Sequence, residues 1–208
     1  MIYLYSGTPG SGKSLHVARV IRDRLAFNHP VIANIPINTS ICKHADKFLY
    51  TSDEDLTPMM LVEYSRNFFK DKPVKEGQIL LIIDEAQRLF NSRDWNKSDR
   101  AGWNTFFQLH RHYGYNIILV AQFDRMLDRQ VRSVVEYEQI HRKISNYGWR
   151  GKLLCALMVA PTLFVSVKMW YPMRERVGSE FFRYSKRLGR MYDTFMTFPA
   201  VTDKKDVG

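Results

Sequence analysis

The chain has 208 residues, of which 45% are hydrophobic, 13% aromatic and 25% charged. This composition is typical of a globular domain with room for a full hydrophobic core, and it excludes a low-complexity chain. The two cysteines, Cys42 and Cys155, exclude a disulfide framework and a cysteine-based zinc site, and they fit a reducing compartment.

The net charge of +10 is unevenly distributed. Residues 125–208 hold 16 Lys or Arg against 8 Asp or Glu, whereas residues 1–124 hold 15 against 13. A basic surface of this kind serves solubility, or it faces the phosphates of nucleic acid or of anionic lipid. The charge alone does not decide between these roles.

The strongest motif in the sequence is a glycine-rich loop that reads Gly7-Thr8-Pro9-Gly10-Ser11-Gly12-Lys13-Ser14. It matches G-x-x-x-x-G-K-[ST], the phosphate-binding loop of P-loop NTPases. Residues 2–5 before it are β-prone, and residues 15–25 after it carry apolar side chains at helical spacing. This strand–loop–helix order favours the motif over a glycine-rich turn with an accidental lysine. A strand that starts at residue 2 also leaves no room for a signal peptide.

Each residue type in this loop has a chemical reason. The glycines let backbone N–H groups approach phosphate oxygens, and the following helix adds its dipole. Lys13 would neutralise the β- and γ-phosphates, and Ser14 would place its hydroxyl on Mg²⁺. We therefore expect ATP and Mg²⁺ as cofactors. The residues expected to bind the nucleotide are Gly7, Thr8, Pro9, Gly10, Ser11, Gly12, Lys13, Ser14 and Leu15.

The second strong signal is an acidic pair at the end of an aliphatic run. A short strand is predicted at 31–33, irregular chain at 34–47, and a helix at 54–69 capped by Asp53 or Asp55. Residues 79–83 then predict a strand buried in a parallel sheet. Asp84 and Glu85 follow it, at the edge where α/β sheets place ligands. Asp84 is predicted to hold Mg²⁺ through water, and Glu85 to polarise the attacking water as general base. The alternative for Glu85 is an acid that stabilises the next helix.

A helix at 100–113 and a strand at 116–122 are predicted next. The aromatic residues of the helix favour a core position over a base-stacking platform, and His110 and His112 point to different faces, which argues against a shared metal site. Gln122 ends the strand as a candidate sensor of the γ-phosphate, or as a plain hydrogen-bonding residue.

Several arginines are candidates for a group that reaches the γ-phosphate of a neighbouring subunit, a contact worth about 10³–10⁵ in rate. For each one taken alone, a surface salt bridge is the ordinary role. The sequence does not choose among Arg111, Arg125, Arg129 and Arg132.

The C-terminal third is predicted to be rich in strands. We expect a strand at 134–143, then a hairpin of 153–159 and 163–168 around a turn at 160–162; a membrane-inserting segment within 153–167 is the alternative. The prediction is one domain over 1–208, with a nucleotide-binding core at 1–133, a basic β-rich extension at 134–200 and a frayed tail at 201–208.

Together these residues resemble a known family. The resemblance rests on the phosphate loop at the extreme N-terminus and on four later blocks, which are Ile83-Asp84-Glu85-Ala86, Asn91-Ser92-Arg93-Asp94-Trp95-Asn96, the run at 116–122 followed by Gln130-Val131-Arg132-Ser133, and Tyr192-Asp193-Thr194. They look like the N-terminal cytoplasmic ATPase domain of the zonular occludens toxin family, which includes the gene I assembly proteins of filamentous phages. Residues 36–75 carry no matching motif, so no function is transferred there.

The resemblance implies a motor at the cytoplasmic face of the inner membrane of the infected bacterium. It implies a homo-oligomeric ring that works with phage coat and export proteins, anchored through a transmembrane segment that is absent from this chain. Anchoring is therefore an inference about a missing part.

We expect an α/β P-loop NTPase of the type with an additional catalytic glutamate, in which helices flank a mainly parallel sheet and a β-rich extension follows. The first functional hypothesis is an ATP-driven motor for phage assembly and export. A DNA-translocating or packaging ATPase is a second, because the basic half permits contact with single-stranded DNA. A toxin-like effector of host-cell junctions is a third, which no export signal or disulfide framework supports.

Overall fold

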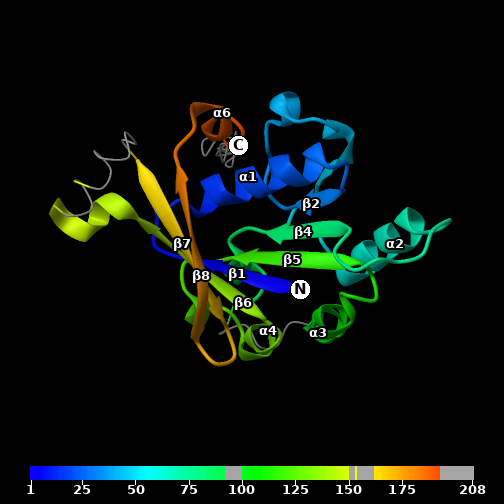
Figure 1. Cartoon of the computed structure of the whole chain (residues 1–208). Helices are drawn as coiled ribbons and strands as arrows, with labels where there is room; N and C mark the ends of the chain where they lie inside the picture. Colours follow the sequence, from blue (N-terminus) through cyan, green and yellow to red (C-terminus); the bar gives the residue numbers. More distant parts are fainter. Residues whose placement is uncertain (92–99, 150–152, 154–161, 193–208) are drawn as a thin grey trace, which may run out of the picture.

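The computed structural model describes residues 1–91, 100–149, 153 and 162–192. Its centre is an eight-stranded sheet in the order β3-β2-β4-β5-β1-β6-β7-β8 (Figure 1). The strands are β1 (Ile2–Ser6), β2 (Val31–Ala33), β3 (Phe48–Tyr50), β4 (Ile79–Ile83), β5 (Tyr115–Val120), β6 (Tyr137–Lys143), β7 (Leu163–Trp170) and β8 (Glu175–Arg183). From β3 to β6 in this order they run parallel, and β7 and β8 add an antiparallel hairpin at one edge.

Helices cover both faces of the parallel part. The α-helices are α1 (Lys13–Ala26), α2 (Pro58–Phe68), α3 (Arg100–Leu109), α4 (Arg129–Ser133) and α6 (Lys186–Gly189). Short 3₁₀ turns are η1 (Thr39–Ile41), η2 (Ala45–Lys47), η3 (Ala86–Arg88), η4 (Asp124–Met126) and η5 (Ile144–Tyr147). Figure 1 shows α1 and α6 on one side of the sheet and α3 and α4 on the other. This arrangement confirms the predicted α/β class, the mainly parallel sheet and the β-rich C-terminal part.

Strand β4 explains why two cores form. Its side chains alternate across the sheet, so Ile79, Leu81 and Ile83 pack with α2 and α3, whereas Leu80 and Ile82 pack under α1. All five are at most 3% exposed. A strand buried on both faces must be apolar at every position, which is the pattern that the sequence showed.

Most predicted elements are present, with shifted ends. The prediction of Asp53 or Asp55 as the cap of the second helix is wrong, because α2 begins at Pro58. The side chain of Thr57 accepts a hydrogen bond from the N–H of Met60 at 3.2 Å, and proline suits the first helical position because its missing N–H is not needed there.

The predicted C-terminal hairpin is also wrong in its pairing. The strand expected at 163–168 is β7, but β6 and β8 occupy both of its edges, so a strand at 153–159 has no free edge to join. Residues 154–161 themselves lie outside the described residues, as does part of the apolar run that offered a membrane-inserting alternative. No helix within the described ranges is both long and apolar enough to cross a membrane.

Replacing Leu81 by alanine tests the central position of β4. Leu81 is fully buried, and a large-to-small change at such a site typically lowers the free energy of unfolding by about 2–5 kcal/mol. Urea denaturation of the purified chain measures this loss. Met59→Ala is the control, because that side chain is 77% exposed and its loss is expected to stay within about 0.5 kcal/mol.

Candidate nucleotide-binding site

The glycine-rich loop follows β1 and has a backbone that only glycine adopts without strain. Gly7, Gly10 and Gly12 have φ angles of 141°, 72° and 96°. A Cβ on Gly7 would stand 2.5 Å from the carbonyl oxygen of His141, and one on Gly12 would stand 2.7 Å from the ring of Phe164. Side chains at 7 and 12 are therefore excluded by contacts as well as by conformation.

The loop opens directly into α1, which begins at Lys13. The first N–H groups of a helix have no partner within it and carry the positive end of its dipole, so they form a site for an anion. Ser11 is only 2% exposed, and its hydroxyl has no hydrogen-bond partner among the described residues. An orphaned donor inside this loop fits a phosphate group.

The ammonium group of Lys13 lies over its own loop. Its Nζ donates to the carbonyl oxygens of Gly7 at 2.5 Å and of Thr8 at 3.3 Å. Burial lowers the pKa of Lys13, and the nearby carboxylates of Glu85 and Asp84 oppose that shift. The loop, the lysine and the acidic pair thus share one electrostatic site.

The backbone of Asp84 is held by a residue that the sequence did not single out. Asn34 follows β2, the neighbour of β4; its Oδ1 accepts from the N–H of Asp84 at 2.6 Å, and its Nδ2 donates to the carbonyl oxygen of Asp84 at 3.0 Å. The same Nδ2 donates to Asp53 at 2.7 Å. The sequence indicates this role only in that Asn34 follows a short predicted strand directly, as Asp84 follows β4.

The carboxylate of Asp84 accepts a hydrogen bond from the hydroxyl of Tyr192 at 2.9 Å. Burial raises the pKa of Asp84, and the charge of Glu85 adds to this, while the hydrogen bond from Tyr192 and the charge of Lys13 act against it. Tyr192 thus contacts Asp84 and lies near Ser14, the other predicted Mg²⁺ ligand. The oxygen donors of Ser14 and Asp84 suit Mg²⁺, which binds hard oxygen ligands.

Glu85 adopts a left-handed backbone conformation, with φ 45° and ψ 48°. Its carboxylate accepts a hydrogen bond from the side-chain amide of Gln87. A strained non-glycine residue is a common mark of a functional position. The alternative role of Glu85, in which its charge stabilises the following helix, is disfavoured, because η3 is a single short turn and the Glu85 side chain does not cap it. Its role as general base stays a prediction.

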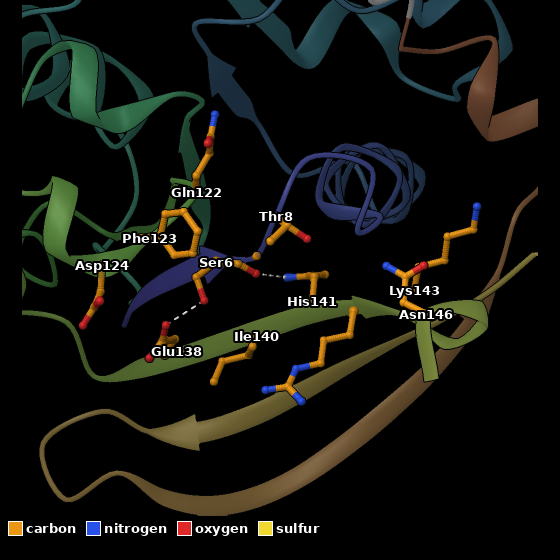
Figure 2. A pocket seen from close by; sticks show the side chains of 12 residues that line it. Ser6, Thr8, Gln122, Phe123, Asp124, Glu138, Ile140, His141, Lys143 and Asn146 are labelled. Atoms are coloured by element: carbon orange, nitrogen blue, oxygen red, sulfur yellow. Dashed lines mark hydrogen bonds between the residues drawn. The ribbon is translucent and has the colours of Figure 1, made fainter. Parts of the chain in front are cut away.

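Gln122 lies beside the loop, two residues after β5 ends. Its carbonyl oxygen accepts from the N–H of Gly7 at 3.1 Å, so the two strand ends are joined through their backbones. In Figure 2 its side chain extends away from Ser6 and Glu138. Its contact with a γ-phosphate stays a prediction.

A cavity of about 450 Å³ adjoins the loop between the ends of β1, β5 and β6. Figure 2 shows its lining residues, which come from all three strand ends and from the turn that follows β6. The carboxylate of Glu138 is buried here and accepts from Ser6 Oγ and from Arg174, each at 2.6 Å. Arg174 also donates to Asp124 at 2.7 Å. Burial would raise the pKa of Asp124, but the hydrogen bond and charge of Arg174 hold it below its usual value.

Two buried histidines connect the loop to the C-terminal strands. His16 Nδ1 and His141 Nε2 are 2.8 Å apart, and His141 Nδ1 lies 3.2 Å from the carbonyl oxygen of Ser6 (Figure 2). Because the carbonyl can only accept, His141 Nδ1 carries the proton, its Nε2 accepts, and His16 Nδ1 donates. Burial lowers the pKa of His16 to about 4 and that of His141 to about 3, so the pair is neutral at pH 7.

The candidate arginines are dispersed. Arg111 lies near the first residue of β1, at the sheet edge opposite the loop, where it pairs with Glu136 at 2.7 Å and with Glu76 at 3.4 Å. It therefore takes no part in its own chain's site. Arg125, in η4, and Arg129, in α4, are exposed, whereas Arg132 is half-buried. The arrangement within one chain does not test which of them reaches a neighbour.

Comparisons with known proteins agree with this fold. The family model of the zonular occludens toxin (Zot) matches residues 1–192. The Gene 1 protein of Enterobacteria phage M13 is 24% identical over 97% of this chain, which spans 61% of that protein's length. The N-terminal domain of zonular occludens toxin from Neisseria meningitidis has a TM-score of 0.57 at 21% identity, covering 92% of this chain and 98% of that one. The genome packaging NTPase B204 of Sulfolobus turreted icosahedral virus 2, solved with ATP-gammaS, has a TM-score of 0.54 at 16% identity, covering 88% and 96%.

The neutral histidine pair makes stability depend on pH. In the unfolded chain these histidines take up protons below their ordinary pKa of about 6.5, whereas the folded pair stays neutral until about pH 4 for His16 and about pH 3 for His141. Acid therefore favours the unfolded chain, and stability falls as the pH drops from about 7 towards 4.

Between about pH 7 and pH 5, the double variant His16→Gln with His141→Gln is expected to lose about 4 kcal/mol less free energy of unfolding than the unmodified chain, which is about 2 kcal/mol for each histidine. Urea denaturation at both pH values measures this. His44→Gln with His112→Gln is the matched control, because both side chains are exposed. An equal acid loss in all three proteins contradicts a neutral buried pair.

Proposed function

We infer that this chain, which belongs to the zonular occludens toxin family, hydrolyses ATP and uses the energy to assemble and export a filamentous phage through the bacterial inner membrane. The observation that carries this inference is the glycine loop placed beside Lys13, Asp84 and Glu85 at the carboxyl edge of a parallel sheet. The Gene 1 proteins of several phages, to which the chain is similar, support the phage role.

Each residue of the site has a role in this proposal. The loop amides and Lys13 bind and orient the phosphates, and Ser14 and Asp84 would hold Mg²⁺, which offsets phosphate charge during phosphoryl transfer. Glu85 orients a water molecule and accepts its proton, after Gln87 has released the carboxylate. Gln122, joined to the loop through Gly7, senses the γ-phosphate.

The remainder of the motor is proposed from the family. We place the chain in the host cytoplasm at the inner membrane, in a homo-oligomeric ring that works with phage coat and export proteins. The chain spans 61% of the length of the M13 Gene 1 protein.

A DNA-translocating or packaging ATPase is the second candidate. The likeness to an NTPase described as genome packaging and the basic residues 125–208 favour it. Binding of single-stranded DNA that weakens steeply with salt supports this candidate, because each phosphate contact releases counterions. Binding to coat protein without DNA binding supports assembly.

Lys13→Ala and Glu85→Gln are each expected to lower the ATPase rate by at least about a hundredfold, since general-base catalysis alone contributes about 10²–10⁴. Both should also abolish phage release when they replace the natural chain in infected cells. Lys13→Ala is expected to weaken nucleotide binding, whereas Glu85→Gln keeps it, which isothermal titration with ATP measures.

The controls are Lys70→Ala and Glu54→Gln, which make the same chemical changes at exposed positions. An unchanged ATPase rate in Glu85→Gln removes that residue from the mechanism. Phage release that persists in a variant without ATPase activity removes the motor role.

Arg125 is the arginine that we propose to act in a neighbouring subunit. It is exposed and makes no ion pair among the described residues, whereas the guanidinium of Arg111 is already paired. Arg125→Ala and Lys13→Ala should each be inactive, and mixing the two proteins should restore part of the ATPase rate, because mixed rings contain interfaces at which Lys13 of one subunit meets Arg125 of its neighbour. A mixture as inactive as its components excludes Arg125 from acting in trans.

A further inference from the structure

The hydroxyl of Tyr192 lies beside the two residues that suit a metal ion. It donates to Asp84 Oδ2 at 2.9 Å, and the side chain of Ser14 lies near enough to affect its pKa. Tyr192 lies beyond α6, far along the chain from both partners, and is only half-buried. It is the last described residue and the last residue that the family model matches.

The chain just before Tyr192 is firmly attached to α1. Leu188 and Met191 are 6% and 0% exposed and pack against Ala18. The carbonyl oxygen of Met191 accepts from the N–H of Asn38 at 3.0 Å. Because the residues up to Met191 are held in place, we expect the Tyr192 side chain itself to rotate when the site opens.

A tyrosine hydroxyl and a hydrated cation are alternatives at this position. The phenolic proton supplies a positive partner to a carboxylate that is otherwise desolvated. Mg²⁺ has near-octahedral geometry with oxygen ligands at about 2.0–2.1 Å and keeps several waters. While the Tyr192 hydroxyl donates to Asp84 Oδ2, it takes the place of a metal-bound water at that oxygen.

We propose that Tyr192 closes the metal site of the nucleotide-free chain, and that binding of Mg²⁺ with ATP displaces its hydroxyl. The proposal rests on the proposed function, because it assigns Ser14 and Asp84 to Mg²⁺. It makes Tyr192 a positioning residue, which acts on the reaction through Asp84.

Tyr192→Phe tests the proposal, because phenylalanine keeps the ring and removes the hydroxyl. Binding of ATPγS is measured by isothermal titration with Mg²⁺ and, separately, with EDTA. Removing a hydrogen bond to a charged group is worth about 1.5 kcal/mol or more, so ATPγS should bind about tenfold more tightly with Mg²⁺. Its affinity in EDTA should not change.

Tyr50→Phe is the matched control, because Tyr50 is 50% exposed on the edge strand β3, and its affinities should equal those of the unmodified chain. Unchanged or weaker Mg²⁺-dependent binding in Tyr192→Phe overturns the proposal, and weaker binding makes Tyr192 a partner that orients Asp84 for the metal. A gain of equal size in EDTA also overturns it, because the hydroxyl would then oppose the nucleotide rather than the cation.

A second readout follows the side chain itself. With fluorotyrosine incorporated, the ¹⁹F resonance that disappears in Tyr192→Phe is assigned to residue 192, and it should shift on addition of Mg²⁺ with ATPγS but not of ATPγS in EDTA. A resonance that stays in place while nucleotide binds contradicts displacement. Failure of the unmodified chain to bind ATPγS under either condition instead overturns the proposed function.

Discussion

Parallel pairing of β1, β4 and β5 is the constraint on which the site depends. A parallel strand cannot return through a tight turn, so each strand must leave the sheet at the same edge. The glycine loop, the acidic pair and Gln122 therefore meet although they are far apart in sequence. Asn34 reaches the same edge from β2 and fixes the backbone of Asp84. Parallel pairing alone thus brings together the candidate phosphate loop, the candidate metal ligand and the candidate base.

The C-terminal hairpin supports this site and is more than an appendage to it. Arg174, in the turn between β7 and β8, neutralises the buried Glu138 and the half-buried Asp124, and Glu138 in turn holds Ser6 directly before the loop. A buried carboxylate without its partner costs several kcal/mol, so the hairpin and the end of β1 stabilise each other. The His16–His141 pair makes a second connection from β6 to the first turn of α1.

The sequence predicts the structure correctly where the local backbone conformation or burial requires a particular type of residue. Gly7 and Gly12 are required by their φ angles, and the five aliphatic residues of β4 are required by burial on both faces. It was uninformative for β8, which is exposed at most positions on both faces and so has no hydrophobic period. It also missed the His16–His141 contact, since 125 residues separate the two and either histidine alone is unremarkable in its helix or strand. Side chains that meet only through tertiary structure leave no pattern to read.

Asp84 shows how a fixed and a movable contact can serve the same residue. Its peptide group is held on both sides by Asn34, a contact that no ligand needs to break. Its carboxylate has a partner from a different part of the chain, and that partner's hydroxyl is all that must leave. Because the backbone stays fixed, exchange of a tyrosine hydroxyl for a cation changes the site without reorganising the sheet.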